Sequence, residues 1–149
     1  MLEPKICAVE PQVLDWFWSR RVGQWVADAL ERSVQHELSL DEVYQGCKDG
    51  TYQLLVTAVG DELAGCAVVG ASHDPTGRPY LALICCSGER VEEWLSLMVT
   101  TCKLLAREIG AREIVVLGRP GWRALLQPYG CRLRAVVMVL DLEQGAEHG

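Results

Sequence analysis

The sequence predicts one α/β (α+β) domain with a mixed, mostly antiparallel central sheet flanked by helices. The length of 149 residues and an apolar content of 50% suit one domain with one core. Three apolar runs of strand length follow one another with short turns between them, a pattern typical of antiparallel neighbours. A long helical pattern between two later apolar runs predicts a crossover connection. The expected order is βααβββαβαβ over residues 1–142, with a polar tail at 143–149.

The N-terminal part is expected to contain one strand and two helices. The strand covers Lys5–Val9, and Pro11 then opens a helical segment with apolar residues at helical spacing as far as Leu30. The second helix begins at a capping box, in which the Ser39 hydroxyl accepts from the Glu42 amide and the Glu42 carboxylate reaches back. This helix is expected to end near Gly50.

The middle of the chain is expected to form three consecutive strands. Tyr52–Val59 and Leu63–Ala71 are joined by the short turn Gly60–Glu62, which predicts a hairpin. The turn Asp74–Gly77 leads into a third strand at Tyr80–Cys86. Because these runs are almost continuously apolar, we expect both faces of the sheet to be covered.

The C-terminal part begins with the strongest helical pattern of the chain. Residues Val91–Ile109 carry apolar side chains at intervals of three and four, and Gly110 is placed to end that helix. A buried strand at Ile114–Leu117, a short helix at Trp122–Leu126 and a final strand at Leu133–Leu142 follow.

Charge and hydropathy exclude some classes of protein. The net charge of −6 argues against nucleic-acid binding, which is typical of basic proteins. No apolar run approaches the roughly 18 residues of a membrane-spanning helix, so no membrane partner is expected. The start of the chain lacks the basic and apolar regions of a signal peptide, and we expect a cytoplasmic protein.

The seven cysteines favour buried, reduced thiols rather than a metal site or disulfides. Their number is odd, and they show no paired C-x-x-C spacing typical of zinc sites. The adjacent Cys85 and Cys86 are expected to point to opposite faces of a strand. No metal is therefore expected.

Several segments resemble GNAT-type N-acyltransferases. The segments Ala106–Ala111, Ile114–Leu117 and Leu125–Cys131 resemble the end of the family's central helix, the strand after it and the region that carries a Tyr-containing helix and Gly-Phe. The segments Leu38–Val43, Val91–Leu95 and Leu117–Trp122 are similar to small GNAT-like proteins encoded by tailed bacteriophages. The resemblance implies a GNAT-like (acyl-CoA N-acyltransferase) fold over most of residues 38–142.

The family's donor-binding loop is degenerate in this sequence. The family places an R/Q-x-x-G-x-G/A loop before its central helix, where glycines let backbone N–H groups approach a pyrophosphate. The corresponding residues, Arg90–Leu95, contain no glycine, and Glu92 and Glu93 would repel phosphate. We therefore expect no cofactor. If acetyl-CoA binds, the candidate residues are Cys86, Ser87, Gly88 and Arg90.

The expected catalytic groups are missing as well. Leu126 stands where the family carries a tyrosine that protonates the leaving thiolate, and Gly121 falls where a polar residue often ends the preceding strand. The remaining catalytic candidates are Tyr129, which is out of register, His73 in a turn, and Glu89 near a strand end.

These observations favour a non-catalytic GNAT-like protein of a tailed bacteriophage, a virion component or assembly factor in the host cytoplasm or the virion. Its partners would be proteins, including other phage virion proteins. The alternatives are an acetyl-CoA-dependent N-acetyltransferase with an atypical cofactor loop, and an inhibitor that binds a host protein through its acidic surface. The candidate interaction residues are aromatic: Trp16, Phe17, Trp18, Trp25 and Trp122. For Trp16, Trp18 and Trp25 in the first helical segment, the sequence favours a broad buried face, and an exposed apolar patch for a partner chain is the alternative.

Overall fold

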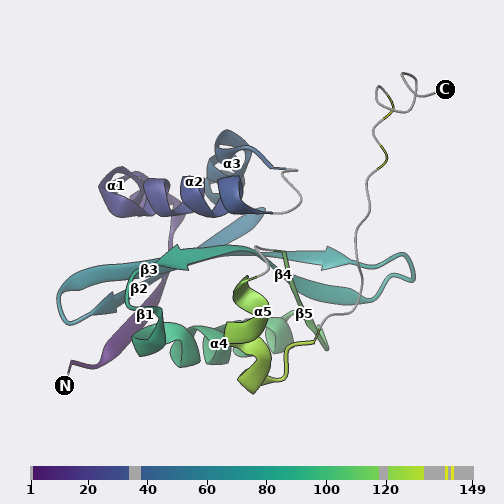
Figure 1. Cartoon of the computed structure of the whole chain (residues 1–149). Helices are drawn as coiled ribbons and strands as arrows, with labels where there is room; N and C mark the ends of the chain where they lie inside the picture. The colour runs from purple at the N-terminus through teal and green to yellow at the C-terminus, as the bar shows by residue number, and fades with distance from the viewer. Residues whose placement is uncertain (1, 34–37, 118–120, 133–139, 141, 143–149) are drawn as a thin grey trace.

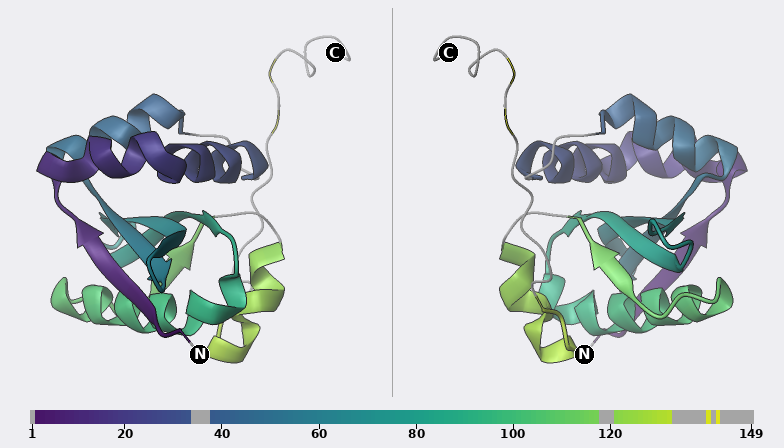
Figure 2. Two further views of the ribbon diagram at one scale, coloured as in Figure 1. Left: turned by 90° about the vertical axis from the view of Figure 1, so that its left-hand side faces the viewer. Right: turned by 90° about the vertical axis from the view of Figure 1, so that its right-hand side faces the viewer.

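The computed structural model describes residues 2–33, 38–117, 121–132, 140 and 142. A central sheet separates two helical layers, with α1, α2 and α3 on one face and α4 and α5 on the other (Figure 1). The two side views in Figure 2 show the same three layers edge-on. The expected mixed sheet between helices is confirmed.

In the described part of the chain, one sheet of five strands follows the order β1-β2-β3-β4-β5. Its strands are β1 (Pro4–Val9), β2 (Tyr52–Val59), β3 (Glu62–His73), β4 (Pro79–Gly88) and β5 (Ile114–Val116). The pairs from β1 to β4 are antiparallel, and β4 and β5 are parallel. The predicted hairpins and the crossover between the last two strands are confirmed.

The first helical segment is less regular than its sequence pattern predicts. It consists of η1 (Pro11–Val13), α1 (Leu14–Phe17), a π-helical turn η2 (Trp18–Val22) and α2 (Gly23–Arg32). A Cβ atom on Gly23 would lie 2.8 Å from the carbonyl oxygen of Trp18 and 2.9 Å from its indole ring. Glycine therefore makes room for the wide turn, and the Trp18 ring packs edge-on against Tyr44 at 5.2 Å between centroids.

The remaining helices follow the predictions closely. Helix α3 (Leu40–Asp49) has both bonds of the capping box: the Glu42 N–H donates to Ser39 Oγ at 3.1 Å, and the Ser39 N–H donates to Glu42 Oε1 at 3.2 Å. Gly50 ends it in the left-handed region with φ of 88°. Helix α4 (Val91–Glu108) and the short α5 (Gly121–Leu126), followed by the turn η3 (Gln127–Tyr129), lie where they were expected.

Two apolar cores confirm that both faces of the sheet are buried. The core under α4 and α5 includes Leu55, Trp94 and Met98, and the core under α1–α3 includes Leu14, Val26 and Val43. Cys86 belongs to the first core and Cys85 to the second, as expected for neighbours on opposite faces of a strand.

The structure corrects several boundaries. Strand β3 extends to His73, and β4 extends to Gly88, so Ser87 and Gly88 belong to a strand and not to a loop. Strand β5 ends at Val116, one residue earlier than predicted. The final strand expected at Leu133–Leu142 lies, apart from positions 140 and 142, outside the described residues.

Candidate active site

Strands β4 and β5 part from one another near the middle of β4. Their pairing runs from Leu81↔Ile114 to Leu83↔Val116, and the N–H of Leu117 donates to the carbonyl of Leu83 at 2.9 Å. The register between β3 and β4 shifts at this point, which leaves Ile84 as the extra residue of a β-bulge. A bulge bends its strand and ends pairing, so β4 turns away from β5 beyond Leu83. We call the resulting opening the fork.

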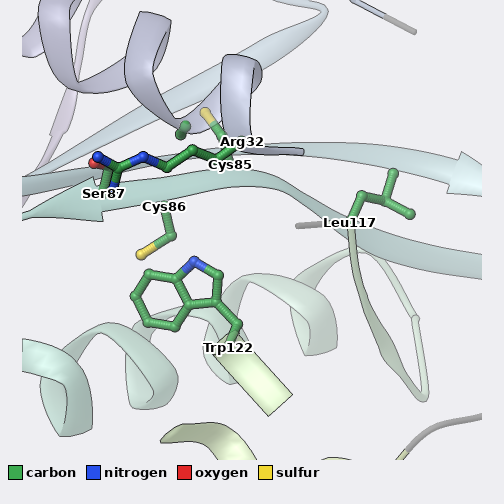
Figure 3. Close-up of a pocket in the computed structure, with 7 residues that line it drawn as sticks. Arg32, Cys85, Cys86, Ser87, Leu117 and Trp122 are labelled. Carbon is green, nitrogen blue, oxygen red and sulfur yellow. The ribbon is translucent and has the colours of Figure 1, made fainter. Parts of the chain in front are cut away.

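Two cavities meet at the fork from opposite faces of the sheet. The smaller one, about 10 Å³, lies on the α2 side, and Arg32 and Ser87 are among its lining residues (Figure 3). The larger one, about 930 Å³, is a groove between α4, β5 and α5. Cys86, Leu117 and Trp122 line both. Ligands of open α/β sheets bind beyond the carboxyl ends of parallel strands, and the fork occupies that place.

Helix α4 begins directly beyond the end of β4. Its N-cap residue Arg90 adopts the left-handed conformation, with φ of 56°, and its side chain does not cap the helix. The guanidinium of Arg90 instead forms an ion pair with Glu93, and Nη2 donates to Glu93 Oε1 at 2.9 Å. This pair lowers the pKa of the Glu93 carboxyl and raises the pKa of Arg90. The first N–H groups of α4 thus have no side-chain cap, and Glu92 and Glu93 flank them.

The cofactor candidates of the sequence lie together at this junction. Cys86 lies in the fork, Ser87 lines the small cavity, and Arg90 begins α4. Gly88 has a structural reason to be glycine: its φ is 148°, and a Cβ atom would lie 2.4 Å from the carbonyl oxygen of Ala64. The close approach of β3 and β4 explains this glycine without a ligand.

The three catalytic candidates are not brought together. Glu89 follows β4 and forms an exposed ion pair with Arg21 of the π-helical turn. Tyr129 lines the large groove. His73 lies opposite Pro79 at the far end of β4, about 20 Å from Cys86 at ~3.3 Å per strand residue, so the structure does not place it at the site.

A role in protein contacts requires exposed rings, and the five aromatic candidates meet this requirement only in part. Trp16 is 51% exposed, its ring is T-shaped to Phe17, and the Arg20 guanidinium lies over it at 3.4 Å. Phe17 and Trp18 are half-buried against the core under α1–α3. The exposure that a role in protein contacts requires is wrong for Trp25 and Trp122, which are 6% and 4% exposed because each faces one of the two cores. For Trp25, the buried face that the sequence favours is confirmed.

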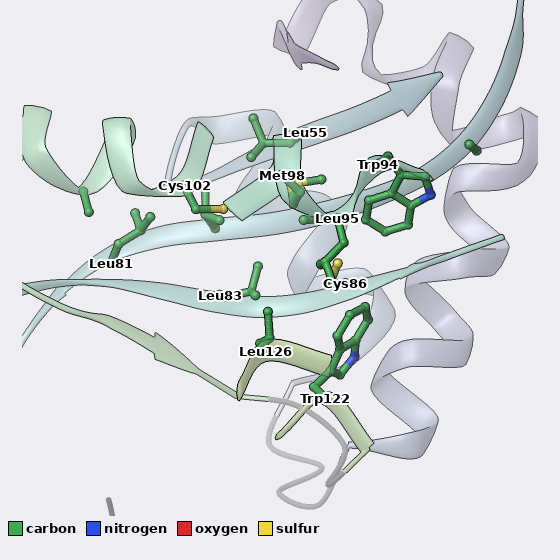
Figure 4. Close-up of a cluster of buried hydrophobic side chains, with 14 of the residues drawn as sticks. Leu55, Leu81, Leu83, Cys86, Trp94, Leu95, Met98, Cys102, Trp122 and Leu126 are labelled. Atoms are coloured by element: carbon green, nitrogen blue, oxygen red, sulfur yellow. The ribbon is translucent and has the colours of Figure 1, made fainter. Parts of the chain in front are cut away.

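Sequence reasoning missed how Trp122 and Arg32 are used. Trp122 is an interaction candidate by sequence, but its ring points toward Cys86 in the fork (Figure 3) and packs in one cluster with Leu95 and Leu126 (Figure 4). Arg32 ends α2 and reaches the small cavity beside Ser87. No local pattern marked either role, because both depend on contacts between distant parts of the chain.

The cysteines are reduced, and most are buried. Burial raises the pKa of the Cys85 thiol to about 12 and that of Cys47 to about 11. Burial also raises the pKa of Cys66 and brings that of Cys102 to about 11. Among the described residues, no group of His, Cys, Asp and Glu has a metal-binding arrangement. No helix in the described ranges combines the length and apolarity needed to cross a membrane.

The overall architecture is shared with solved acetyltransferases. The ribosomal-protein-alanine N-acetyltransferase from Brucella melitensis biovar Abortus 2308 superimposes with a TM-score of 0.68 at 12% identity, over 93% of this chain and 99% of that one. A predicted acetyltransferase from Clostridium acetobutylicum, solved with acetyl-CoA, gives a TM-score of 0.69 at 12% identity, over 95% and 97%.

The chain has a GNAT-like fold. An aminoglycoside acetyltransferase from an uncultured soil metagenomic sample, in complex with trehalose, has the same fold, with a TM-score of 0.64 at 13% identity over 93% of this chain and 96% of that one. No protein-family model and no curated protein matches the sequence. At these identities the likeness establishes the fold, and function has to be argued from the site.

Proposed function

We propose that this protein is an N-acyltransferase that uses an acyl thioester of coenzyme A, with transfer at the fork between β4 and β5. The observation that carries the proposal is the meeting of two cavities, from opposite faces of the sheet, at Cys86, Leu117 and Trp122. A group-transfer enzyme needs one place where the reacting carbonyl of the donor is held and can be reached by the acceptor. The fork offers that arrangement, and the fold is the one found in solved acetyltransferases.

The larger groove suits the donor. Its volume of about 930 Å³ matches the pockets of several hundred Å³ that hold organic ligands, whereas the cavity of about 10 Å³ does not hold a long thioester arm. The uncapped start of α4 supplies backbone N–H groups and positive potential for phosphate. Glu92 and Glu93 oppose phosphate there, although the Arg90 pair partly neutralises Glu93. The larger groove therefore suits the thioester arm of the donor well, whereas the start of α4 suits the phosphates less well.

The chemistry requires little of the protein beyond orientation and proton transfer. The acceptor amine attacks the thioester carbonyl, a C–N bond forms, the C–S bond breaks, and the amine loses a proton. Pairing between β4 and β5 ends at Leu83↔Val116, and a backbone group of β4 beside the fork is our candidate to orient the thioester carbonyl. Tyr129, which lines the groove, is our candidate to protonate the leaving thiolate, since Leu126 cannot. Glu89 lines neither cavity and pairs with Arg21, so it is our candidate to accept the amine proton only when that ion pair opens.

Calorimetric titration with acetyl-CoA tests this function. We expect micromolar binding that is competed by coenzyme A, together with slow release of free thiol when a mixture of primary amines is added. Adenosine bisphosphate serves as the control ligand, because it carries the phosphates without the arm that the groove is expected to hold. Absence of binding at millimolar acetyl-CoA would reject the proposal.

A second candidate is the non-catalytic role in a tailed-phage particle. It is favoured by the carboxylates Glu92 and Glu93 at the start of α4, by Leu126 in place of a proton donor, and by the exposed ring of Trp16. In this case the protein binds other proteins, and the fork is a feature of the fold that has no catalytic role. Mass spectrometry of purified phage particles tests it. Presence of the chain in the particle together with no acetyl-CoA binding would support this candidate over the first.

A further inference from the structure

Trp122 occupies the centre of the fork. It is the second residue of α5 and only 4% exposed, and its indole ring points toward Cys86 of β4 (Figure 3). The ring is the largest of the three side chains that line both cavities. It therefore stands where a group must pass from the groove toward the small cavity.

The space beyond the ring is very small. The cavity on the α2 side measures about 10 Å³, roughly the space of one water molecule. Its other lining residues are Ala29 and the exposed Arg32 of α2, Cys85 and Ser87 of β4, and Leu117 directly after β5. The backbones of α2 and β4 hold Ala29, Cys85 and Ser87 in place, so on these sides the space cannot grow without distortion of the core. A methyl group is comparable with this space, and a longer alkyl chain is not.

We propose that Trp122 limits the acyl group to acetyl by closing the fork to longer chains, an inference that rests on the proposed function. Trp122 comes from a short helix outside the sheet, so this wall can be shortened without a substitution in β4 or β5. In a tight apolar pocket, one additional methylene changes binding by roughly tenfold or more. Acetyl-CoA is therefore preferred over hexanoyl-CoA by at least about tenfold.

The test is calorimetry with acetyl-CoA and hexanoyl-CoA on the full chain and its variants. Wild type binds acetyl-CoA at least about tenfold more tightly, and Trp122→Leu reduces that preference to within about threefold. Trp122→Phe gives an intermediate preference for acetyl-CoA over hexanoyl-CoA. It replaces Trp122→Leu in the test if circular dichroism shows that the leucine variant does not fold. Trp16→Leu, which removes an exposed indole outside the fork, leaves the wild-type preference unchanged.

The outcomes separate this inference from the function on which it rests. If wild type binds both esters equally well, or if folded Trp122→Leu or Trp122→Phe keeps the full preference, the role of Trp122 is rejected and the acyltransferase proposal stands. If neither wild type nor any variant binds either ester, the proposed function is rejected and the inference with it.

Discussion

The indole Nε1–H of Trp94 donates a 2.7 Å hydrogen bond to the carbonyl oxygen of Glu89. This bond joins the first turn of α4 to the residue that follows β4. Trp94 is fully buried, and a Cβ atom on Gly65 would lie 2.4 Å from its ring, so the absent side chain of Gly65 makes room for the indole. The start of α4 is thereby fixed relative to the fork.

Trp94→Phe is expected to destabilise the protein by about 2 kcal/mol, because it removes buried volume and leaves the Glu89 carbonyl without its indole donor. Urea denaturation measures the loss as a lower midpoint at an unchanged slope. The matched control Trp16→Phe alters a ring that is 51% exposed and is expected to stay within about 0.5 kcal/mol of wild type. Equal effects of the two variants would contradict this account of Trp94.

Local features of the sequence predicted most elements correctly. The capping box at Ser39 and Glu42 placed the start of α3, and Gly50 placed its end, because each acts through neighbours in the chain. The near-continuous apolar runs of β2 and β3 predicted burial on both faces. These signals depend on residues a few positions apart, which is why they can be read without a structure.

Features that depend on tertiary contacts could not be predicted. The bulge at Ile84, which opens the fork, is a property of strand register and leaves no residue pattern. The π-helical turn needs the contact between Gly23 and Trp18. The short α5 offers too few positions for a helical period to show that Trp122 faces inward. The sequence therefore predicted individual candidate residues, but it did not predict that some of them lie around one opening between β4 and β5.

Ser39→Ala is expected to cost about 1 kcal/mol, because the Glu42 N–H loses its acceptor and the capping box is broken. Thermal unfolding checks this as a fall in Tm. Ser96→Ala, an exposed serine inside α4, is the control and is expected to be neutral or slightly stabilising, because alanine has the higher helix propensity. A Tm for Ser39→Ala that matches the control would show that the cap does not stabilise the fold.

Iodoacetamide at pH 8 is expected to modify Cys7 first, because its thiol is exposed. Cys85 and Cys47 are buried, and pKa values of about 12 and about 11 keep them protonated, so both react only on unfolding. Timed labelling followed by peptide mass spectrometry measures each site. In Cys7→Ser the fast phase disappears. Modification of Cys85 at the rate of Cys7 would contradict the buried placement of β4.

Asp15 links acid stability to the N-terminal helices. Hydrogen bonds from the Tyr44 hydroxyl and from Lys48 lower the pKa of its carboxyl below the ordinary value. A lowered pKa in the folded state means that this stabilisation is complete above about pH 4 and is lost as the pH falls through the folded pKa. Asp15→Asn should therefore lower Tm at pH 7 and have a smaller effect near pH 3. Tyr44→Phe, which removes the main donor, should weaken the same pH dependence; parallel curves for wild type and Asp15→Asn would refute the link.

Glu92→Gln is expected to tighten the binding of coenzyme A by about fivefold at low salt. The change removes one carboxylate from the start of α4, where each repulsion with phosphate costs on the order of 1 kcal/mol, and it leaves the Arg90–Glu93 pair intact. Glu108→Gln, at the opposite end of the same helix, makes the same change in net charge and should leave the affinity unchanged. The gain should shrink as salt is added, because exposed charges are screened. Equal gains from the two variants would show that the effect comes from net charge and that the phosphates do not bind at the start of α4. A gain confined to Glu92→Gln would support phosphate binding at the start of α4, beside the fork.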